Sequence, residues 1–430
     1  MRGTASTRSR WLLVAVAAGA MGAAGTYQFV WSSLSGAVAG RVPASETALG
    51  TVFTLFVVAQ TLVQLPAGSI RDRYGPRRLL PVASVLLFGG FAGTALASSL
   101  PVVAASYAVG GLGSGIAYTV AVNTPVKWFG ADERRGLATG VVTMAYGGVS
   151  VVAIPLVRRG LGVSFETTLL ALGGVLGAVG LLAAAVLRDP ETVEADGGSE
   201  PDDDAADPSP DRQGRGGEGD ATAVGWRAAV RTWQFWALYG VMLAVNGVGL
   251  MVIGQSVGLA TGLGLSAATA TTAASIVAAA DGAGILVIGG LSDRFGDERT
   301  LGASLVCSGG ALAVAVLLGE SGLGPAFVAL LGAASFFRSP AFSVVPAIVG
   351  RYYGAARSSE NYAAVYTAKV PGGVVGGTAT AALVAAVGWS RAFYVGAVLL
   401  SAAGVVALLL RPVDIDDRRP DAATDDASRA

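Results

Sequence analysis

The sequence predicts an all-α membrane protein in which twelve transmembrane helices form two pseudo-symmetric six-helix bundles. Three observations carry this prediction. The composition is 53% hydrophobic and only 13% charged, whereas a soluble domain carries about 25% charged residues. Apolar segments long enough to cross a bilayer recur along the whole chain. A charged motif between two of these segments returns once in the second half, which indicates an internal duplication.

The duplicated motif is the clearest sign of two halves. Its first copy is Gly68-Ser-Ile-Arg-Asp-Arg-Tyr-Gly-Pro-Arg-Arg78, and its second copy is Gly289-Gly-Leu-Ser-Asp-Arg-Phe-Gly-Asp-Glu-Arg299. Equivalent residues of the two copies stand 221 positions apart. A second repeat relates Lys127-Trp-Phe-Gly130 to Arg351-Tyr-Tyr-Gly354. Two halves with matched loops are the expected product of such a parallel repeat.

Twelve segments have the length and apolarity of a transmembrane helix. Because a backbone in lipid must satisfy its own hydrogen bonds, we expect helices and not strands. The first segment follows three arginines, and we interpret it as a helix and not a cleaved signal peptide because many spans follow it. The segments lie near 11–32, 46–66, 79–98, 101–124, 136–157, 165–187, 234–254, 267–288, 300–319, 325–348, 361–386 and 391–410.

The composition changes between the two halves. Residues 188–230 are acidic, rich in Gly and Pro and poor in apolar residues, so we expect a disordered cytoplasmic linker. The predicted organisation is a six-helix bundle over 1–187, this linker, a second bundle over 231–411 and a disordered cytoplasmic tail over 412–430. With both termini in the cytoplasm, 23 of the 29 Lys and Arg residues lie in cytoplasmic segments, as the positive-inside rule requires. The expected location is the cell membrane.

Three charged residues lie inside predicted spans of the second half: Asp281, Arg338 and Lys369. Each costs about 2.5–3.5 kcal/mol at a helix centre, so such residues face a cavity and pair with one another or with a substrate. Lys369 is predicted to bind an anion, because an ammonium attracts a carboxylate strongly where screening is weak; the alternative is a lysine that Asp281 holds for folding alone. Arg338 is a second candidate for carboxylate binding. Asp281 is either a carrier of a coupling proton or a static counter-ion.

Polar and aromatic residues inside the spans are candidates to complete a substrate site. For each aromatic residue the alternative is packing or anchoring at the membrane interface. The candidates are Tyr27, Gln60, Tyr118, Tyr146 and Tyr366. The sequence has no histidine, no nucleotide-binding loop, no metal-ligand cluster and no catalytic triad. It therefore predicts neither an enzyme nor a protein that needs a cofactor, a metal or a nucleic acid.

The two Gly-x-x-x-Asp-Arg-(Tyr/Phe)-Gly motifs resemble the signature of the major facilitator superfamily, found there between helices two and three and between helices eight and nine. The resemblance extends over about the whole chain and implies the fold of that transporter family. It also implies a gating role for Asp72, Arg73, Asp293 and Arg294, which would cap a helix end and pair across the cytoplasmic gate. The alternative is a plain topology loop. The chain departs from the pattern at Arg71, where a small residue is usual.

A narrower resemblance follows from four further segments. They are Tyr27-Gln-Phe-Val-Trp-Ser32, Asn123-Thr-Pro-Val-Lys-Trp-Phe129, Arg134-Arg-Gly-Leu-Ala-Thr-Gly140 and Tyr366-Thr-Ala-Lys-Val-Pro-Gly-Gly373. These segments are similar to the oxalate/formate antiporter branch and its monocarboxylate transporter relatives. In the oxalate/formate branch, a basic residue at the position of Lys369 binds the substrate carboxylate. The branch also has an arginine in helix eight where this chain has Ile285, so the resemblance does not imply a dianion held by two basic residues from helices eight and eleven.

These patterns predict a secondary active transporter of a small organic anion, a monocarboxylate, that works by alternating access with proton symport or anion exchange. Its expected partners are that anion, a proton or an exchanged anion, and the lipid bilayer, and we expect a monomer. Two alternatives stay open. One is a proton-coupled exporter of drugs or metabolites in which Asp281 carries the proton. The other is a non-transporting membrane sensor that signals through the 188–230 linker.

Overall fold

The computed structural model describes residues 7–129, 135–188, 225–354 and 358–412, and within these ranges every regular element is a helix. The first half contains α1 (Thr7–Ala39), α2 (Glu46–Tyr74), α3 (Pro76–Ala95), α4 (Leu100–Phe129), α5 (Arg135–Gly148), α6 (Ser150–Leu161) and α7 (Phe165–Val186). The second half contains α8 (Trp226–Ala229), α9 (Trp233–Gly262), α10 (Ala267–Phe295), α11 (Asp297–Glu320), α12 (Gly324–Arg338), α13 (Ala341–Tyr353), α14 (Ser358–Tyr366), α15 (Lys369–Val374), the π-helical segment η2 (Val375–Ala379), α16 (Thr380–Val387) and α17 (Trp389–Leu408).

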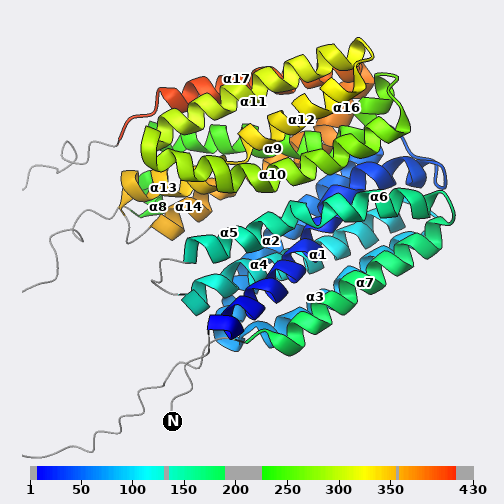
Figure 1. The fold of residues 1–430 in the computed structure, drawn as a ribbon, viewed down its shortest axis with the longest axis horizontal. Helices are drawn as coiled ribbons and strands as arrows, with labels where there is room; N and C mark the ends of the chain where they lie inside the picture. Colours follow the sequence, from blue (N-terminus) through cyan, green and yellow to red (C-terminus); the bar gives the residue numbers. More distant parts are fainter. Residues whose placement is uncertain (1–6, 130–134, 189–224, 355–357, 413–430) are drawn as a thin grey trace, which may run out of the picture.

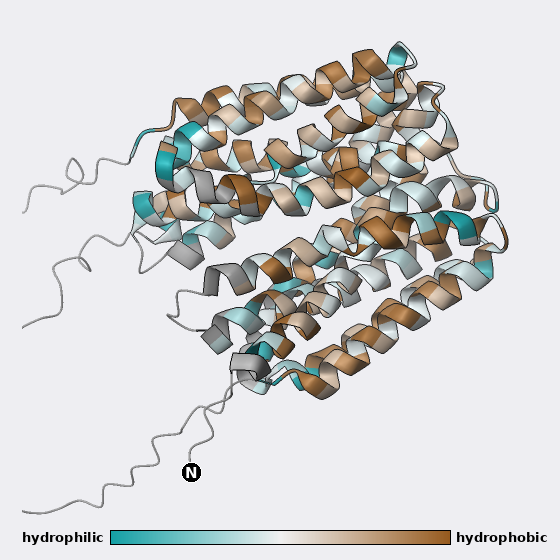
Figure 2. Ribbon diagram, viewed as in Figure 1, coloured by the Kyte–Doolittle hydropathy of each residue, from teal (hydrophilic) through white to brown (hydrophobic). Residues whose placement is uncertain are grey.

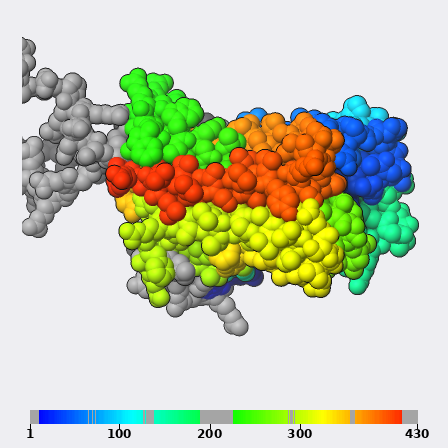
Figure 3. Space-filling view, turned by 90° about the horizontal axis from the view of Figure 1, so that it is seen from above, coloured from blue at the N-terminus to red at the C-terminus, as the bar shows by residue number. Residues whose placement is uncertain are grey.

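The helices form two bundles that lie side by side (Figure 1). The start of α1 and the end of α17 lie at one end of the molecule, which we call the terminal end, and the α1–α2 connection lies at the far end (Figure 1). On the outer face of the second bundle, α17 runs between α9 and α11 (Figure 3). Most of the predicted linker and tail, residues 189–224 and 413–430, lies outside the described residues.

Hydrophobic residues predominate along the outer helices of both bundles, such as α7 in the first and α11 in the second (Figure 2). Val85 on α3, Leu182 on α7 and Val398 on α17 are each at least 60% exposed, a surface suited to lipid and not to water. Eleven helical segments of the described chain are long and apolar enough to cross a membrane. The remaining predicted span, 267–288, lies within α10. The fold is therefore the predicted all-α membrane architecture of twelve spans in two bundles.

Three spans that the sequence predicts as single helices are interrupted. The span near 136–157 divides into α5 and α6, the span near 325–348 into α12 and α13, and the span near 361–386 into α14, α15, η2 and α16. Proline explains the second and third interruptions, because it lacks the N–H that would bond four residues back. The Phe336 carbonyl, left free by Pro340, accepts from the Ser339 hydroxyl at 3.2 Å, and the Thr367 carbonyl, left free by Pro371, accepts from the Val370 N–H at 2.9 Å. These breaks place Arg338 and Lys369 at helix ends.

The duplicated motif is more helical than the sequence suggests. Helix α2 continues through the first copy to Tyr74, and α10 continues through the second copy to Phe295. Each helix then ends at a glycine with positive φ, 74° at Gly75 and 85° at Gly296, a conformation that glycine adopts without a steric penalty. The charged loop is therefore a one-residue turn between long helices, and it recurs in both halves.

The described contacts between the bundles include a closely packed seam near the far end. We define this seam as Gly50 and Thr54 of α2 with Gly373, Gly377 and Thr378 of α15 and η2. A Cβ on Gly50 would lie 2.7 Å from the Gly377 carbonyl oxygen. The Thr54 hydroxyl donates to the Gly373 carbonyl at 3.1 Å and accepts from the Thr378 N–H at 2.9 Å. Small residues and hydroxyls of this kind let helices approach closely in lipid.

Candidate functional site

A cavity of about 80 Å³ lies between the two bundles, and both contribute to its walls. The walls include five residues that the sequence predicts for a substrate site: Tyr118, Tyr146, Arg338, Tyr366 and Lys369. They come from α4 and α5 in the first bundle and from α12, α14 and α15 in the second. The fold therefore brings together residues that are up to 251 positions apart in the chain.

Lys369 is the cation that enters the cavity without an acidic partner. Its side chain is 7% exposed, and its ammonium donates to Gln60 Oε1 at 3.2 Å. The ammonium also lies 5.9 Å from the centre of the Tyr366 ring, within the range of a cation–π contact. In the part of the chain that the structure describes, no carboxylate lies within ion-pair distance of Lys369. The alternative in which Asp281 holds Lys369 is not the arrangement observed.

Behind Lys369, uncharged groups of the first bundle form a hydrogen-bonded chain. Gln60 is fully buried and donates from Nε2 to Ser114 Oγ at 2.7 Å and to the Tyr146 hydroxyl at 2.9 Å. Tyr146 in turn donates to Gln28 Oε1 at 2.8 Å. Gln60 does not line the cavity itself, but its amide orients the ammonium that does. The position of the lysine in one bundle thus depends on amides of the other.

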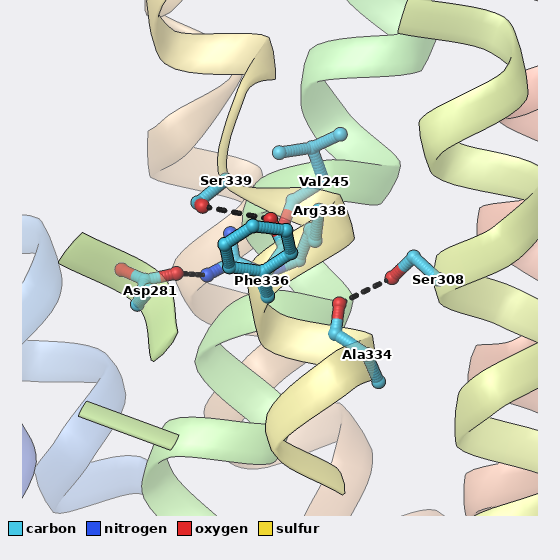
Figure 4. Close-up of polar contacts among 7 residues, drawn as sticks. All are labelled: Val245, Asp281, Ser308, Ala334, Phe336, Arg338 and Ser339. Carbon is cyan, nitrogen blue, oxygen red and sulfur yellow. Dashed lines mark hydrogen bonds and ion pairs between the residues drawn. The ribbon is translucent and has the colours of Figure 1, made fainter. Parts of the chain in front are cut away.

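Asp281 and Arg338 form a buried ion pair beside the cavity (Figure 4). Arg338 reaches from the end of α12 to Asp281 on α10, and its Nη1 donates to the Val245 carbonyl at 3.3 Å. Arg338 is 3% exposed and Asp281 9%. Gly249 on α9 makes room for this arginine, because a Cβ there would lie 2.4 Å from Nη1. The cavity therefore receives a guanidinium whose charge a carboxylate already balances.

The structure places Tyr27 away from the cavity. Its ring lies inside the first bundle and stacks on Phe91 with ring centroids 3.8 Å apart. Its hydroxyl donates to the Leu87 carbonyl at 2.8 Å, and the residue is fully buried. Tyr27 therefore packs inside the first bundle, which is the alternative to substrate binding, and it does not line the cavity.

Sequence reasoning missed three polar residues of the cavity wall: Gln28, Thr143 and Asn246. Gln28 and Asn246 carried a usable signal, since a side-chain amide inside an apolar span must find a partner in the protein. Thr143 carried none, because a threonine in a helix commonly bonds to its own backbone, as it does here to the Thr139 carbonyl at 2.8 Å. Within the described residues, no group of three or more acidic, Cys or His side chains is placed to hold a metal ion.

Of the four predicted gating residues, Arg294 alone has a described side chain. It is exposed in the last turn of α10, at the terminal end. The side chains of Asp72, Arg73 and Asp293 lie outside the described residues. Their gating role stays a prediction.

Comparison with known proteins gives a consistent family assignment. The chain matches the family model described as Major Facilitator Superfamily over residues 11–257 and 240–429. It is 28% identical over 412 residues to the oxalate:formate antiporter of Oxalobacter formigenes, which covers 94% of this chain and 92% of that protein. It is 29% identical over 395 residues to an uncharacterized 38 kDa protein in the 23S RNA operon of Thermoproteus tenax, with 91% and 94% covered. The uncharacterized MFS-type transporter YhjX of Escherichia coli (strain K12) is 25% identical over 368 residues, or 84% of each chain.

Among solved structures, the fold is similar to that of a bacterial homolog of the human lysosomal transporter Spinster in an inward-facing and unoccupied conformation. The TM-score is 0.66 over 94% of this chain and 96% of that chain. At 16% sequence identity this likeness concerns the fold alone.

Proposed function

This chain belongs to the major facilitator superfamily, and we propose that it is a secondary active transporter of a small organic anion, a monocarboxylate. It is a membrane transporter and not an enzyme. The proposed coupling is exchange for a second anion or symport with a proton. The observation that carries the proposal is the buried Lys369 ammonium in a cavity between the bundles, without an acidic partner among the described residues.

Electrostatics explains why this lysine favours an anion. Placing a lysine within a membrane span costs about 2.5–3.5 kcal/mol on insertion scales, and the Gln60 amide supplies only a neutral acceptor. A carboxylate at 4 Å would contribute about 4 kcal/mol at an effective dielectric constant of about 20, against about 1 kcal/mol in water. The site therefore gains more from an anionic substrate than from a neutral or cationic one.

The size of the cavity favours a small substrate. Its volume of about 80 Å³ is well below the roughly 300–1,000 Å³ of sites that hold drug-sized ligands. Short carboxylates fit this restriction. A bulky drug would require the bundles to separate around it.

The relative from Oxalobacter formigenes supports the same class of substrate. That protein is described as an oxalate:formate antiporter, and the alignment covers nearly the whole of both chains. Its description favours anion exchange for this chain over proton symport. At 28% identity, this relative supports a class of substrate for this chain and not a particular anion.

For the transport cycle, we propose that the bundles over 1–187 and 231–411 rock around the cavity. With both chain ends in the cytoplasm, as the distribution of basic residues predicts, the far-end seam closes the external side. Asp72, Arg73, Asp293 and Arg294 would then act at the opposite, cytoplasmic gate. A monomer suffices for this cycle, because both walls of the cavity come from one chain.

The two alternatives receive less support. A drug exporter that uses Asp281 as its proton carrier would have to release that carboxylate from its buried ion pair with Arg338. A sensor that signals through the 188–230 linker depends on residues that lie mostly outside the described ranges. No observation on the described residues favours either alternative over anion transport.

The experiment is uptake of labelled formate, acetate, lactate and oxalate into proteoliposomes, with and without a counter-anion inside. We expect uptake of at least one monocarboxylate, and we expect Lys369→Met to weaken its apparent affinity by about 30-fold or more. That figure corresponds to the roughly 2 kcal/mol or more lost when one member of a buried charged pair is truncated. Lys369→Arg should keep part of the activity, because it keeps the charge.

Arg391→Met provides a matched control. Arg391 is exposed at the start of α17 and does not line the cavity, so its loss removes one positive charge without touching the site. Uptake by Arg391→Met should equal that of the unchanged protein. Normal uptake by Lys369→Met would overturn the role assigned to the lysine, and efflux of cations that needs Asp281 but not Lys369 would favour the exporter.

A further inference from the structure

The two cations of the cavity wall differ in whether an acidic side chain neutralises them. Arg338 lines the cavity, and Asp281 binds its Nη2. Lys369 lines the same cavity and meets only a neutral amide oxygen. Among the described residues, these two cations are the only charged side chains of the wall, and Asp281 is the only acid paired with either. Two positive charges and one negative charge leave the site with one uncompensated positive charge.

We infer that Asp281 determines the charge of the transported anion: by occupying Arg338, it leaves a site that accepts a monoanion and rejects a dianion. This inference rests on the proposed anion transport. A monocarboxylate would bind Lys369 and leave the Asp281–Arg338 pair intact. The second carboxylate of a dianion would have to take Arg338 from Asp281, and a buried carboxylate would lose its partner.

Arg338 lines the cavity wall and keeps one donor that no described residue uses. Its Nε lies buried without a hydrogen-bond partner among the described residues, although a guanidinium in a low-dielectric site normally uses its donors. The Val245 carbonyl accepts from Nη1 at 3.3 Å and Gly249 leaves room for the guanidinium, so the arginine would stay beside the cavity without Asp281. Asp281 therefore masks a carboxylate site and does not merely support the fold.

The variant Asp281→Asn removes the negative charge of the side chain and nearly preserves its shape. Asp281→Asn keeps an oxygen that accepts from Arg338 Nη2 and removes the negative charge that neutralises it. The site would then carry two positive charges, which match a dicarboxylate. The expected gain of dianion binding distinguishes a determinant of specificity from a structural ion pair, because loss of a purely structural pair would weaken every ligand.

The test measures binding and not transport, at neutral pH, where the probes are fully ionised. Thermal stabilisation of the purified full chain is titrated with formate and acetate as monoanions and with oxalate and malonate as dianions. In the unchanged protein we expect monoanions to bind about 100-fold more tightly than dianions or better, the factor expected when a buried ion pair must break. In Asp281→Asn we expect the affinity for at least one dianion to rise by about tenfold or more.

The double variant Asp281→Asn/Arg338→Gln is the control. It returns the site to one positive charge, so the gain for dianions should disappear while monoanion binding through Lys369 remains. Asp281→Asn that binds monoanions but gains no dianion overturns this inference and leaves anion transport standing. The unchanged protein tests the inference without any variant, because equal affinity for oxalate and formate overturns it too. If no anion binds either protein, the proposed function fails together with it.

Discussion

The two bundles contribute different chemistry to one cavity. The first bundle lines the described wall with uncharged polar groups, such as Gln28 and Tyr146, and the second supplies Arg338 and Lys369, with Asp281 behind them. Both halves keep the turn glycine of the duplicated motif, Gly75 in the first and Gly296 in the second. The two halves therefore share this turn between their helices, whereas the charged side chains described at the cavity wall come from the second half.

The first bundle still fixes the position of Lys369 in the second bundle. The hydrogen bond from Lys369 to Gln60 joins the second bundle to the first, and it lies beside the seam that α2 and η2 form. A bond between two bundles weakens when they move apart, so it favours the conformation in which they are close. If the anion binds at Lys369 as proposed, its binding and the position of the bundles are linked through one amide.

The largest expected effect comes from removing one member of the buried ion pair in the second bundle. Arg338→Met leaves the Asp281 carboxylate buried without its ion-pair partner. We expect the free energy of unfolding to fall by about 3–5 kcal/mol, since removal of one member of a buried pair strands the other charge. Thermal unfolding of the purified protein in detergent measures the loss.

Two variants show whether the stranded charge is the cause. Asp281→Leu/Arg338→Met removes both charges and should recover most of the stability, because an apolar pair of similar volume replaces a buried ion pair with little loss. Arg351→Met removes an arginine that pairs with Glu298 at 2.8 Å but is 46% exposed, so we expect a loss under about 1 kcal/mol. A double variant as unstable as Arg338→Met would contradict this explanation.

A smaller effect is expected from opening the seam between the bundles. Gly50→Val places side-chain atoms against the Gly377 carbonyl and the Ala381 methyl group, both 2.7 Å from the position of the new Cβ. We expect the closed far end to lose about 1.4 kcal/mol or more, which is a tenfold change in population. The reporter is Thr143→Cys in the cavity wall, in a Cys307→Ser background, labelled on intact cells by a membrane-impermeant thiol reagent.

A glycine outside the seam supplies the comparison. A Cβ on Gly174 of α7 meets no atom within 4 Å, so Gly174→Val should leave the labelling rate unchanged. Gly50→Val should raise that rate about tenfold. Equal rates in the two variants would mean that the seam does not hold the far end closed.

Much of this asymmetry was readable from the sequence. A charge within an apolar span is costly, so Asp281, Arg338 and Lys369 stood out by position alone. The spans and the duplication followed from composition and from one repeated motif. Hydropathy patterns, however, give no distances between helices, so the sequence does not decide whether Arg338 or Lys369 pairs with Asp281.

The choice of partner and the aromatic residues needed the structure. Arg338 reaches Asp281 because α12 ends beside Pro340 and Gly249 leaves room for the guanidinium. Tyr27 and Tyr146 are both tyrosines inside predicted spans of the first half, and the sequence offers no reason to assign them different roles. The Tyr27 ring lies among Phe91 of α3 and Tyr107 of α4 in the core of the first bundle, whereas Tyr146 on α5 lines the cavity.

The smallest expected effect tests how far the first bundle acts through Lys369. Tyr146→Phe removes the hydroxyl that accepts from Gln60 and donates to Gln28. A net hydrogen bond contributes about 0.5–1.5 kcal/mol, so we expect KM for the transported anion to rise by about 3–10-fold with the maximal rate unchanged. Tyr27→Phe is the matched control, because its hydroxyl bonds to the Leu87 carbonyl inside the bundle and not at the cavity. It should lower thermal stability and leave KM as it was. Equal KM changes in the two variants would mean that loosening the bundle, and not the amide chain to Lys369, sets the affinity.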